Sequence, residues 1–262
     1  MHNFEFVKPS TIADAARAMS AEGAQALSGG QTLLPTMKQR LAQPDTLVSL
    51  TGIPEMQGVC MGDGGLHIGA ATIHAIVARE AASHYPALAK LAGGIGDPAV
   101  RNRGTIGGSL ANNDPAACYP AGALGSNATI VTNTRKIAAD DYFQGMFTTA
   151  LDEGEIITSV VFPIPQKAAY VKFDQPASRF SLTAVFVAKF ADGVRVAVTG
   201  ASNNGVFRWT EAETALSANF SASAISGLTV SPADMISDLH GTAAYRANLV
   251  KVLTGRAVTA AG

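Results

Sequence analysis

Two glycine-rich segments carry the residue types that can bind phosphate. The first is Ser28-Gly29-Gly30-Gln31-Thr32, between a predicted strand and a predicted helix. Glycine has no Cβ, so phosphate oxygens can come close to its backbone N–H groups, and a helix N-terminus adds a favourable dipole. Gln31 and Thr32 add side-chain donors. Many strand-to-helix turns need glycine, so this segment alone is a weak signal of anion binding.

The second segment is Arg103-Gly104-Thr105-Ile106-Gly107-Gly108-Ser109, followed by Asn112-Asn113-Asp114-Pro115. Thr105 and Ser109 could donate to phosphate, and Asp114 could accept from a ribose or a ring nitrogen. The alternative is a well-capped connecting loop, since Asn and Asp commonly stabilise turns. A dinucleotide has two phosphates, so we expect both segments to face one crevice and to supply donors from both sides.

Neither segment has the standard dinucleotide or nucleotide signature. G-x-G-x-x-G and the Walker A sequence are both absent, which disfavours a Rossmann fold and a P-loop. No nucleophile elbow supports Ser-His-Asp hydrolysis. Asp140 and Asp141 are interpreted as the start of a helix or turn with a structural role. We therefore assign no catalytic residue to this chain.

The histidines and cysteines show no metal-binding pattern. The five histidines are scattered, and we expect surface or hydrogen-bonded structural positions for most of them. Cys60 and Cys118 lie far apart and form no C-x-x-C pair, which excludes an iron–sulfur cluster or a cysteine-rich zinc site held by this chain alone. We expect both cysteines to be buried free thiols. No metal ligand is assigned.

Composition bounds the class of protein. The chain has 262 residues, of which 47% are hydrophobic and only 15% charged, which is ample for packed cores and leaves low-charge surface for burial against other subunits. The formal net charge of −1 disfavours nucleic acid or an anionic membrane as a partner. The first six residues lack a signal-peptide pattern, and no apolar run approaches about 20 residues. We expect a cytoplasmic protein without a membrane span.

The first part of the chain reads as a β-α-β-α-β unit, which favours a small parallel sheet. Its predicted strands are Phe4–Val7, Gln25–Leu27 and Thr46–Leu50, and its predicted helices are Thr11–Ala21 and Thr32–Leu41.

A second pattern begins near Gly58. It predicts a strand at 66–68, a helix capped by Thr72, a helix at 85–92, and strands at 129–132, 136–138 and 155–162. The stretch from Gly93 to Pro120 is rich in Gly, Asn, Asp and Pro and is predicted to be irregular, which is typical of functional segments. Pro163 and Pro165 then suggest a domain boundary.

The last third predicts three antiparallel strands followed by helices. The strands are 169–173, 183–190 and 195–199, with a hairpin turn at Asp192-Gly193, and the helices are 211–217 and 245–253. The fold class is therefore α+β. We expect one domain over 1–167, with subdomains of about 1–55 and 56–167, and a C-terminal domain over 168–262.

At the two glycine segments the sequence resembles the FAD-binding medium subunit of molybdenum hydroxylases, the group that includes xanthine dehydrogenase and aerobic carbon monoxide dehydrogenase. Members carry (S/A)GGxS/T-L-x-P-x-(M/L)-K, here Ser28 to Lys38, and RNxGTIGGxxANxDP, here Arg101 to Pro115. The likeness covers nearly the whole chain in order. It continues at residues 140–145, 147–151, 154–157, 170–179 and 245–246.

The resemblance implies a fold and a cofactor site. The fold is the FAD-binding type of p-cresol methylhydroxylase (PCMH) and vanillyl-alcohol oxidase (VAO), with two α/β subdomains and a smaller C-terminal domain. The FAD pyrophosphate is expected between the two segments, without a covalent tether. Matched cofactor-binding positions are Ser28, Gly29, Gly30, Gln31, Thr32, Thr105, Ile106, Gly107, Gly108, Ser109, Asp114 near the flavin, and Lys172 in the C-terminal domain. Phe180 stands where the carbon monoxide dehydrogenase subunit has a Tyr beside the isoalloxazine, so the ring contact is kept and the hydroxyl is lost.

The resemblance also implies an electron-transfer subunit of an oxidoreductase. FAD would take electrons from [2Fe-2S] clusters on an iron–sulfur small subunit and pass them to a terminal acceptor, while a large subunit with the molybdenum cofactor oxidises the substrate. A dimer of heterotrimers is expected. The alternatives are a free-standing FAD-dependent oxidase or reductase, for which no acid–base constellation is evident, and a flavin-free assembly module, against which the intact glycine segments count.

Overall fold

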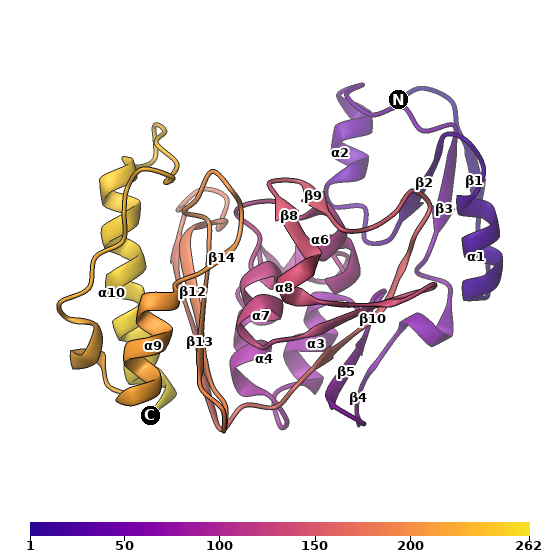
Figure 1. The fold of residues 1–262 in the computed structure, drawn as a ribbon. Coiled ribbons are helices and arrows are strands. Elements are labelled where there is room, and N and C mark those ends of the chain that lie inside the picture. The colour runs from indigo at the N-terminus through magenta and orange to yellow at the C-terminus, as the bar shows by residue number, and fades with distance from the viewer.

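The computed structural model describes residues 1–262, the whole chain, and begins with a three-stranded parallel sheet (Figure 1). Its strands are β1 (Glu5–Val7), β2 (Ala24–Leu27) and β3 (Thr46–Ser49) in the order β1-β3-β2, joined by α1 (Ile12–Met19) and α2 (Leu33–Lys38). The predicted parallel sheet is confirmed. Helix α2 is shorter than predicted, because Arg40 adopts a left-handed φ of 61° that ends the helical path.

The middle of the chain forms a five-stranded antiparallel sheet in the order β4-β5-β10-β6-β7. The strands are β4 (Val59–Gly62), β5 (Gly65–Gly69), β6 (Thr129–Thr132), β7 (Lys136–Ala138) and β10 (Ile157–Phe162). Around it lie η1 (Pro54–Met56), α3 (His74–Glu80), α4 (Pro86–Gly93), α7 (Tyr119–Gly125), α8 (Ala139–Tyr142) and the hairpin of β8 (Phe143–Gly145) and β9 (Thr148–Thr149). Thr72 does not cap α3 as predicted. Its hydroxyl accepts from the N–H of Gly58 and donates to the C=O of the same residue, and Ile73 is the residue that precedes the helix.

The stretch from 93 to 120 is not irregular as predicted. It contains α5 (Pro98–Arg101) and α6 (Ile106–Asn112) and runs into α7. The side chains of Asp97 and Thr105 cap the two short helices. Each accepts from the N–H of the residue three positions later in the chain. Gly107 packs against the end of β5, where a Cβ would lie 2.6 Å from that of Ala70. Capping and tertiary packing therefore outweigh the weak helix propensity of glycine and asparagine here.

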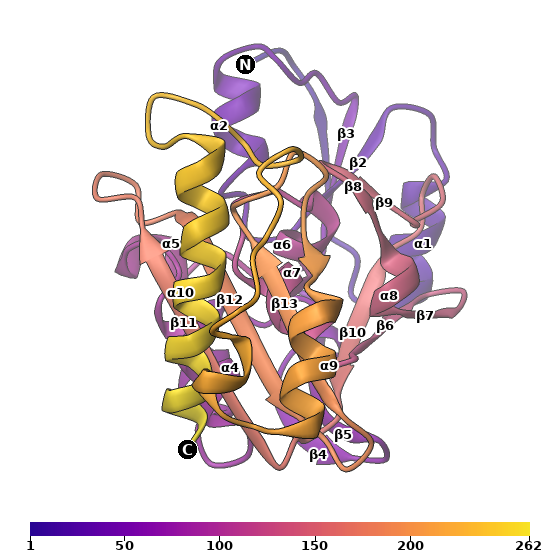
Figure 2. The same ribbon diagram turned by 60° about the vertical axis from the view of Figure 1, so that its left-hand side comes forward.

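The C-terminal part forms a four-stranded antiparallel sheet rather than the predicted three strands. To β11 (Lys167–Asp174), β12 (Ser181–Lys189) and β13 (Val194–Thr199) it adds β14 (Phe207–Arg208), a two-residue strand too short to give a sequence pattern. Helices α9 (Thr210–Ala218), η2 (Ala222–Ile225) and α10 (Ala243–Ala261) follow. Figure 2 shows α9 and α10 lying across the outer face of this sheet. No helix in the chain has both the length and the apolar composition to cross a membrane.

Strand β12 lies between two hydrophobic cores. Ala184, Phe186 and Ala188 belong to the larger core, which includes α4 and α7, while Val185 and Val187 point to a smaller core under α9 and α10. The inner face thus packs with the first two-thirds of the chain. The domain boundary at 167/168 stays a prediction. The larger core contains residues from both sides of this boundary.

The structure tests the predictions for Asp140 and for the two cysteines, with different outcomes. Asp140 accepts from Arg195 on β13 and Arg208 on β14, so its structural role is confirmed. Cys118 is buried, whereas Cys60 is exposed on the edge strand β4, and the expectation that both thiols are buried is wrong for Cys60.

Candidate functional site: a cleft between the two glycine segments

The two glycine segments line one cleft of about 660 Å³. The cleft runs between the first parallel sheet and the middle of the chain, with the loop between β11 and β12 at its edge. Eleven of the thirteen predicted site residues line it: Ser28, Gly29, Gly30, Gln31, Thr32, Thr105, Gly107, Gly108, Ser109, Asp114 and Phe180. Ile106 and Lys172 do not.

The first segment offers a run of unused backbone donors. None of the N–H groups of residues 28–33 donates to another group of the protein. Gly30 has a φ of 68°, a conformation that glycine adopts without strain and that turns the chain from β2 towards α2. Backbone N–H groups need a partner when they are covered, so these six donors fit a bound anion with several oxygens.

The second segment differs, because its N–H groups are already used. Gly107 N donates to Ala70 O at 2.9 Å, Gly108 N to Thr105 Oγ1 at 3.2 Å, and Ser109 N to Thr105 O at 3.0 Å. The backbone of this segment therefore offers no free donor at residues 107–109, and the prediction of donors from both sides rests on its side chains. The side chain of Ile106 is buried in the larger core. What remains for a ligand is the Ser109 hydroxyl and the close approach that Gly108 allows.

The segments touch each other through glycine. A Cβ on Gly29 would lie 2.2 Å from Arg103 O and 2.6 Å from Gly104 Cα. Beside this contact, Thr105 Oγ1 donates to Ser28 Oγ at 2.8 Å. The width of the cleft is thus fixed by a contact between two backbones that no other residue at position 29 would permit.

Asp114 and Phe180 also line the cleft. Asp114 Oδ1 accepts from Ala116 N at 2.8 Å, which leaves Oδ2 free of protein partners. The side chain of Lys172 is only 7% exposed, and its Nζ donates to Gly94 O at 2.6 Å and to Arg179 O at 2.9 Å. Lys172 therefore supports the loop that carries Phe180 and does not line the cleft.

His74 lines the cleft as well, although no sequence pattern singled it out. It is buried, its Nδ1 has no partner, and its ring centroid lies 5.3 Å from that of Tyr119. His74 is thus an exception among the histidines, most of which were expected at surface or hydrogen-bonded positions. Burial, with a smaller contribution from the charge of Arg101, lowers the pKa of His74 to about 4, so the ring is neutral at pH 7.

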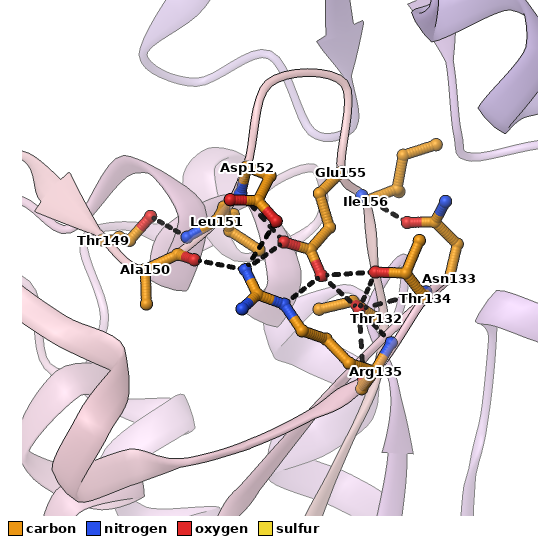
Figure 3. Close-up of polar contacts among 10 residues, drawn as sticks. All are labelled: Thr132, Asn133, Thr134, Arg135, Thr149, Ala150, Leu151, Asp152, Glu155 and Ile156. Carbon is orange, nitrogen blue, oxygen red and sulfur yellow. Dashed lines mark hydrogen bonds and ion pairs between the residues drawn. The ribbon is translucent and has the colours of Figure 1, made fainter.

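Glu155 forms a second unpredicted feature, shown in Figure 3. Its side chain is 2% exposed and accepts from Arg135 Nε and Nη2 at 3.0 and 2.9 Å. The hydroxyls of Thr132 and Thr134 and the N–H of Asp152 also donate to it. The Arg135 hydrogen bond is the main reason that the pKa of Glu155 lies well below its usual range. This network holds the 150–156 loop, part of the cleft wall, onto the β6–β7 turn.

Comparison with known proteins identifies the family. Residues 2–165 match the family described as the FAD binding domain in molybdopterin dehydrogenase. The chain is 34% identical to the nicotine 6-hydroxylase medium subunit of Paenarthrobacter nicotinovorans, over 98% of this chain and 96% of that one. It is 33% identical to the carbon monoxide dehydrogenase medium chain of Afipia carboxidovorans, with the same coverage.

Solved structures agree in fold. Reconstituted CO dehydrogenase from Oligotropha carboxidovorans superposes with a TM-score of 0.88 at 29% identity, over 99% of this chain and 98% of that one. Quinoline 2-oxidoreductase from Pseudomonas putida 86 gives a TM-score of 0.88 at 26% identity, over 99% and 97%. The chain belongs to the FAD-binding medium subunits of molybdenum hydroxylases, a class of oxidoreductase components. The free donors of residues 28–33 and the close contact at Gly29 fit the pyrophosphate of FAD.

The close contact of Gly29 with Arg103 and Gly104 can be tested by substitution. Gly29→Ala forces the two segments apart and is expected to raise the dissociation constant for FAD at least about tenfold. Titration of the flavin-free chain measures this. Gly227→Ala is the matched control, because a Cβ at Gly227 meets nothing within 4 Å. Equal FAD affinity in both variants, with folded circular dichroism spectra, would remove this contact from the site.

The ionised Glu155 network should make the stability of the fold depend on pH. Since the folded-state pKa of Glu155 is lowered, its ionised form stabilises the fold above the unfolded-state pKa of about 4.3, and this stabilisation is lost as pH falls towards the lowered value. Glu155→Gln should lower the melting temperature at pH 7 by roughly 3–8 °C, since hydrogen bonds to charged groups contribute about 1.5–3 kcal/mol.

The same variant should show a smaller fall in melting temperature between pH 7 and pH 3 than the wild type. Glu153→Gln, a change at an exposed neighbour, is the control and should follow the wild-type curve. Parallel pH profiles for Glu155→Gln and the wild type would contradict the role of the ionised carboxylate.

Proposed function

We propose that this chain is the electron-transfer FAD subunit of a heteromeric molybdenum hydroxylase. It takes electrons from [2Fe-2S] clusters of a small subunit and passes them to a terminal acceptor, while a large subunit with the molybdenum cofactor oxidises the substrate. The proposal includes a dimer of heterotrimers. The observation that carries it is the cleft with six free N–H donors, in a chain that matches medium chains over almost their whole length.

The proposed roles of the cleft residues follow from the hydrogen-bonding groups that have no partner within the protein. The N–H groups of residues 28–33 would hold the phosphate oxygens, with the Ser109 hydroxyl opposite. The free Oδ2 of Asp114 would accept from an N–H or O–H of the cofactor, and Phe180 would lie against its ring. Bound FAD supplies the exchange between one-electron and two-electron transfer.

The cleft offers little for acid–base chemistry on a substrate of its own. Glu155 is held as a carboxylate by Arg135, and its lowered pKa makes it a poor proton donor at neutral pH. His74 is uncharged at pH 7 and lies behind Gly104, where a Cβ would be 2.6 Å from its Nε2. These environments favour the relay over a free-standing FAD oxidase or reductase.

The relay predicts that substrate reduces the flavin only in the assembled complex. The chain loaded with FAD is mixed anaerobically with carbon monoxide, aldehydes, purines and N-heteroaromatic compounds, with and without the copurifying subunits, and the flavin absorption band is followed. Bleaching is expected for one substrate class and only with the partners, whose iron and molybdenum are measured in the same sample.

Two outcomes contradict this. Bleaching of the lone chain by a substrate would establish the free-standing flavoenzyme. A native chain that carries no flavin, with or without partners, would favour a flavin-free assembly module. Acid precipitation of the same sample should release the FAD, as a noncovalent cofactor requires.

A further inference from the structure

Two half-exposed aromatic rings lie in the wall of the cleft. Phe147 is 59% exposed and Phe180 is 53% exposed, and both line it. They come from hairpins far apart in the chain, one between β8 and β9 and the other between β11 and β12. Large rings left in contact with water beside a cleft are typical of surfaces that a ligand covers.

Phe147 is held in a conformation that bulky residues rarely adopt. Its φ is 55°, in the left-handed region, which is strained for a side chain with a large ring. Asn113 maintains it: Nδ2 donates to Gly145 O and to Thr148 O at 2.8 Å, and Phe147 N donates to Asn113 O at 3.0 Å. Asn113 is itself buried, with a φ of 43°. The structure thus fixes an exposed ring at a strained position.

The second ring is held in a similar way. Arg179, next to Phe180, has a φ of 59°, and its carbonyl accepts from the buried Lys172. Ser181 N then donates to Ala116 O at 3.4 Å. Both hairpins are therefore bonded to the same short segment, at Asn113 and at Ala116.

This segment brings parts of the two hairpins close together. Three residues along the chain span at most about 11 Å, so the two attachment points are close together. Asp114, with its free Oδ2, lies between them. The cleft therefore has two aromatic side chains on hairpins that bond to one short segment, and a carboxylate oxygen on that segment that can accept from a ring N–H.

We infer that Phe147 is a positioning residue that contacts the isoalloxazine ring of FAD and, with Phe180, sets its place in the cleft. This rests on the proposed function. A flat tricyclic ring with one ring N–H matches two aromatic surfaces and an acceptor. The exposure of both rings also suits a site for the ring that exchanges electrons with partner proteins.

A new indole at this position tests the contact directly, because tryptophan quenches flavin emission on contact. Phe147→Trp in the full chain loaded with FAD should lose most of its flavin fluorescence. Phe6→Trp, on β1 and outside the cleft, is the control and should keep it. The single native tryptophan, Trp209, is buried in the smaller core and is common to both variants.

Loss of the ring gives the complementary result. Phe147→Leu should still bind one FAD through the first glycine segment but raise its dissociation constant about three- to tenfold and shift the flavin reduction potential. Phe147→Tyr should restore both values. Asn113→Gly keeps the left-handed backbone accessible but removes the two bonds to the hairpin, and it should reproduce the effect of Phe147→Leu.

The outcomes separate this inference from the proposed function. A wild-type chain that binds no FAD refutes both. A wild-type chain with one FAD, unquenched in Phe147→Trp and unaltered in affinity and potential in Phe147→Leu, refutes only the role of Phe147. Unchanged FAD properties together with loss of copurifying subunits from Phe147→Leu would make the ring a partner contact and also overturn the inference.

Discussion

The cofactor cleft depends on a backbone-to-backbone contact that only glycine permits. Gly29, at the end of β2, lies against the carbonyl of Arg103 and the Cα of Gly104, where any Cβ would overlap these atoms. This contact seats the small parallel sheet on the middle of the chain. The N–H groups of residues 28–33, on the same segment, have no protein acceptors.

The two glycine segments are similar in sequence but differ in how their backbone N–H groups are used. The first keeps its backbone donors free, whereas the second uses them within α6 and against Ala70. Asn113 and Ala116 bond to hairpins from two parts of the fold, each with an exposed phenylalanine that lines the cleft. The cleft thus combines free N–H donors with exposed aromatic side chains. Such a combination suits a cofactor that has both phosphates and a flat ring, as FAD has.

The sequence predicted what depends on local pattern. The alternation of strands and helices before residue 50 predicted the parallel sheet, and Lys136–Ala138 was placed to the residue. It mispredicted the 93–120 stretch, because caps at Asp97 and Thr105 and the contact of Gly107 with Ala70 override low helix propensity. The positions of Lys172 and Phe147 depend on hydrogen bonds to Gly94 and Asn113, far away in sequence, which no local pattern shows.

The most direct test is amide hydrogen exchange of the full chain with and without FAD. Exchange in residues 28–33 should slow strongly when FAD binds, since these N–H groups have no partner in the protein and would bond to the phosphates. Residues 106–109 should exchange slowly in both states, because their N–H groups are already bonded. Unchanged exchange in residues 28–33 with one FAD bound per chain would show that these N–H groups do not hold the cofactor.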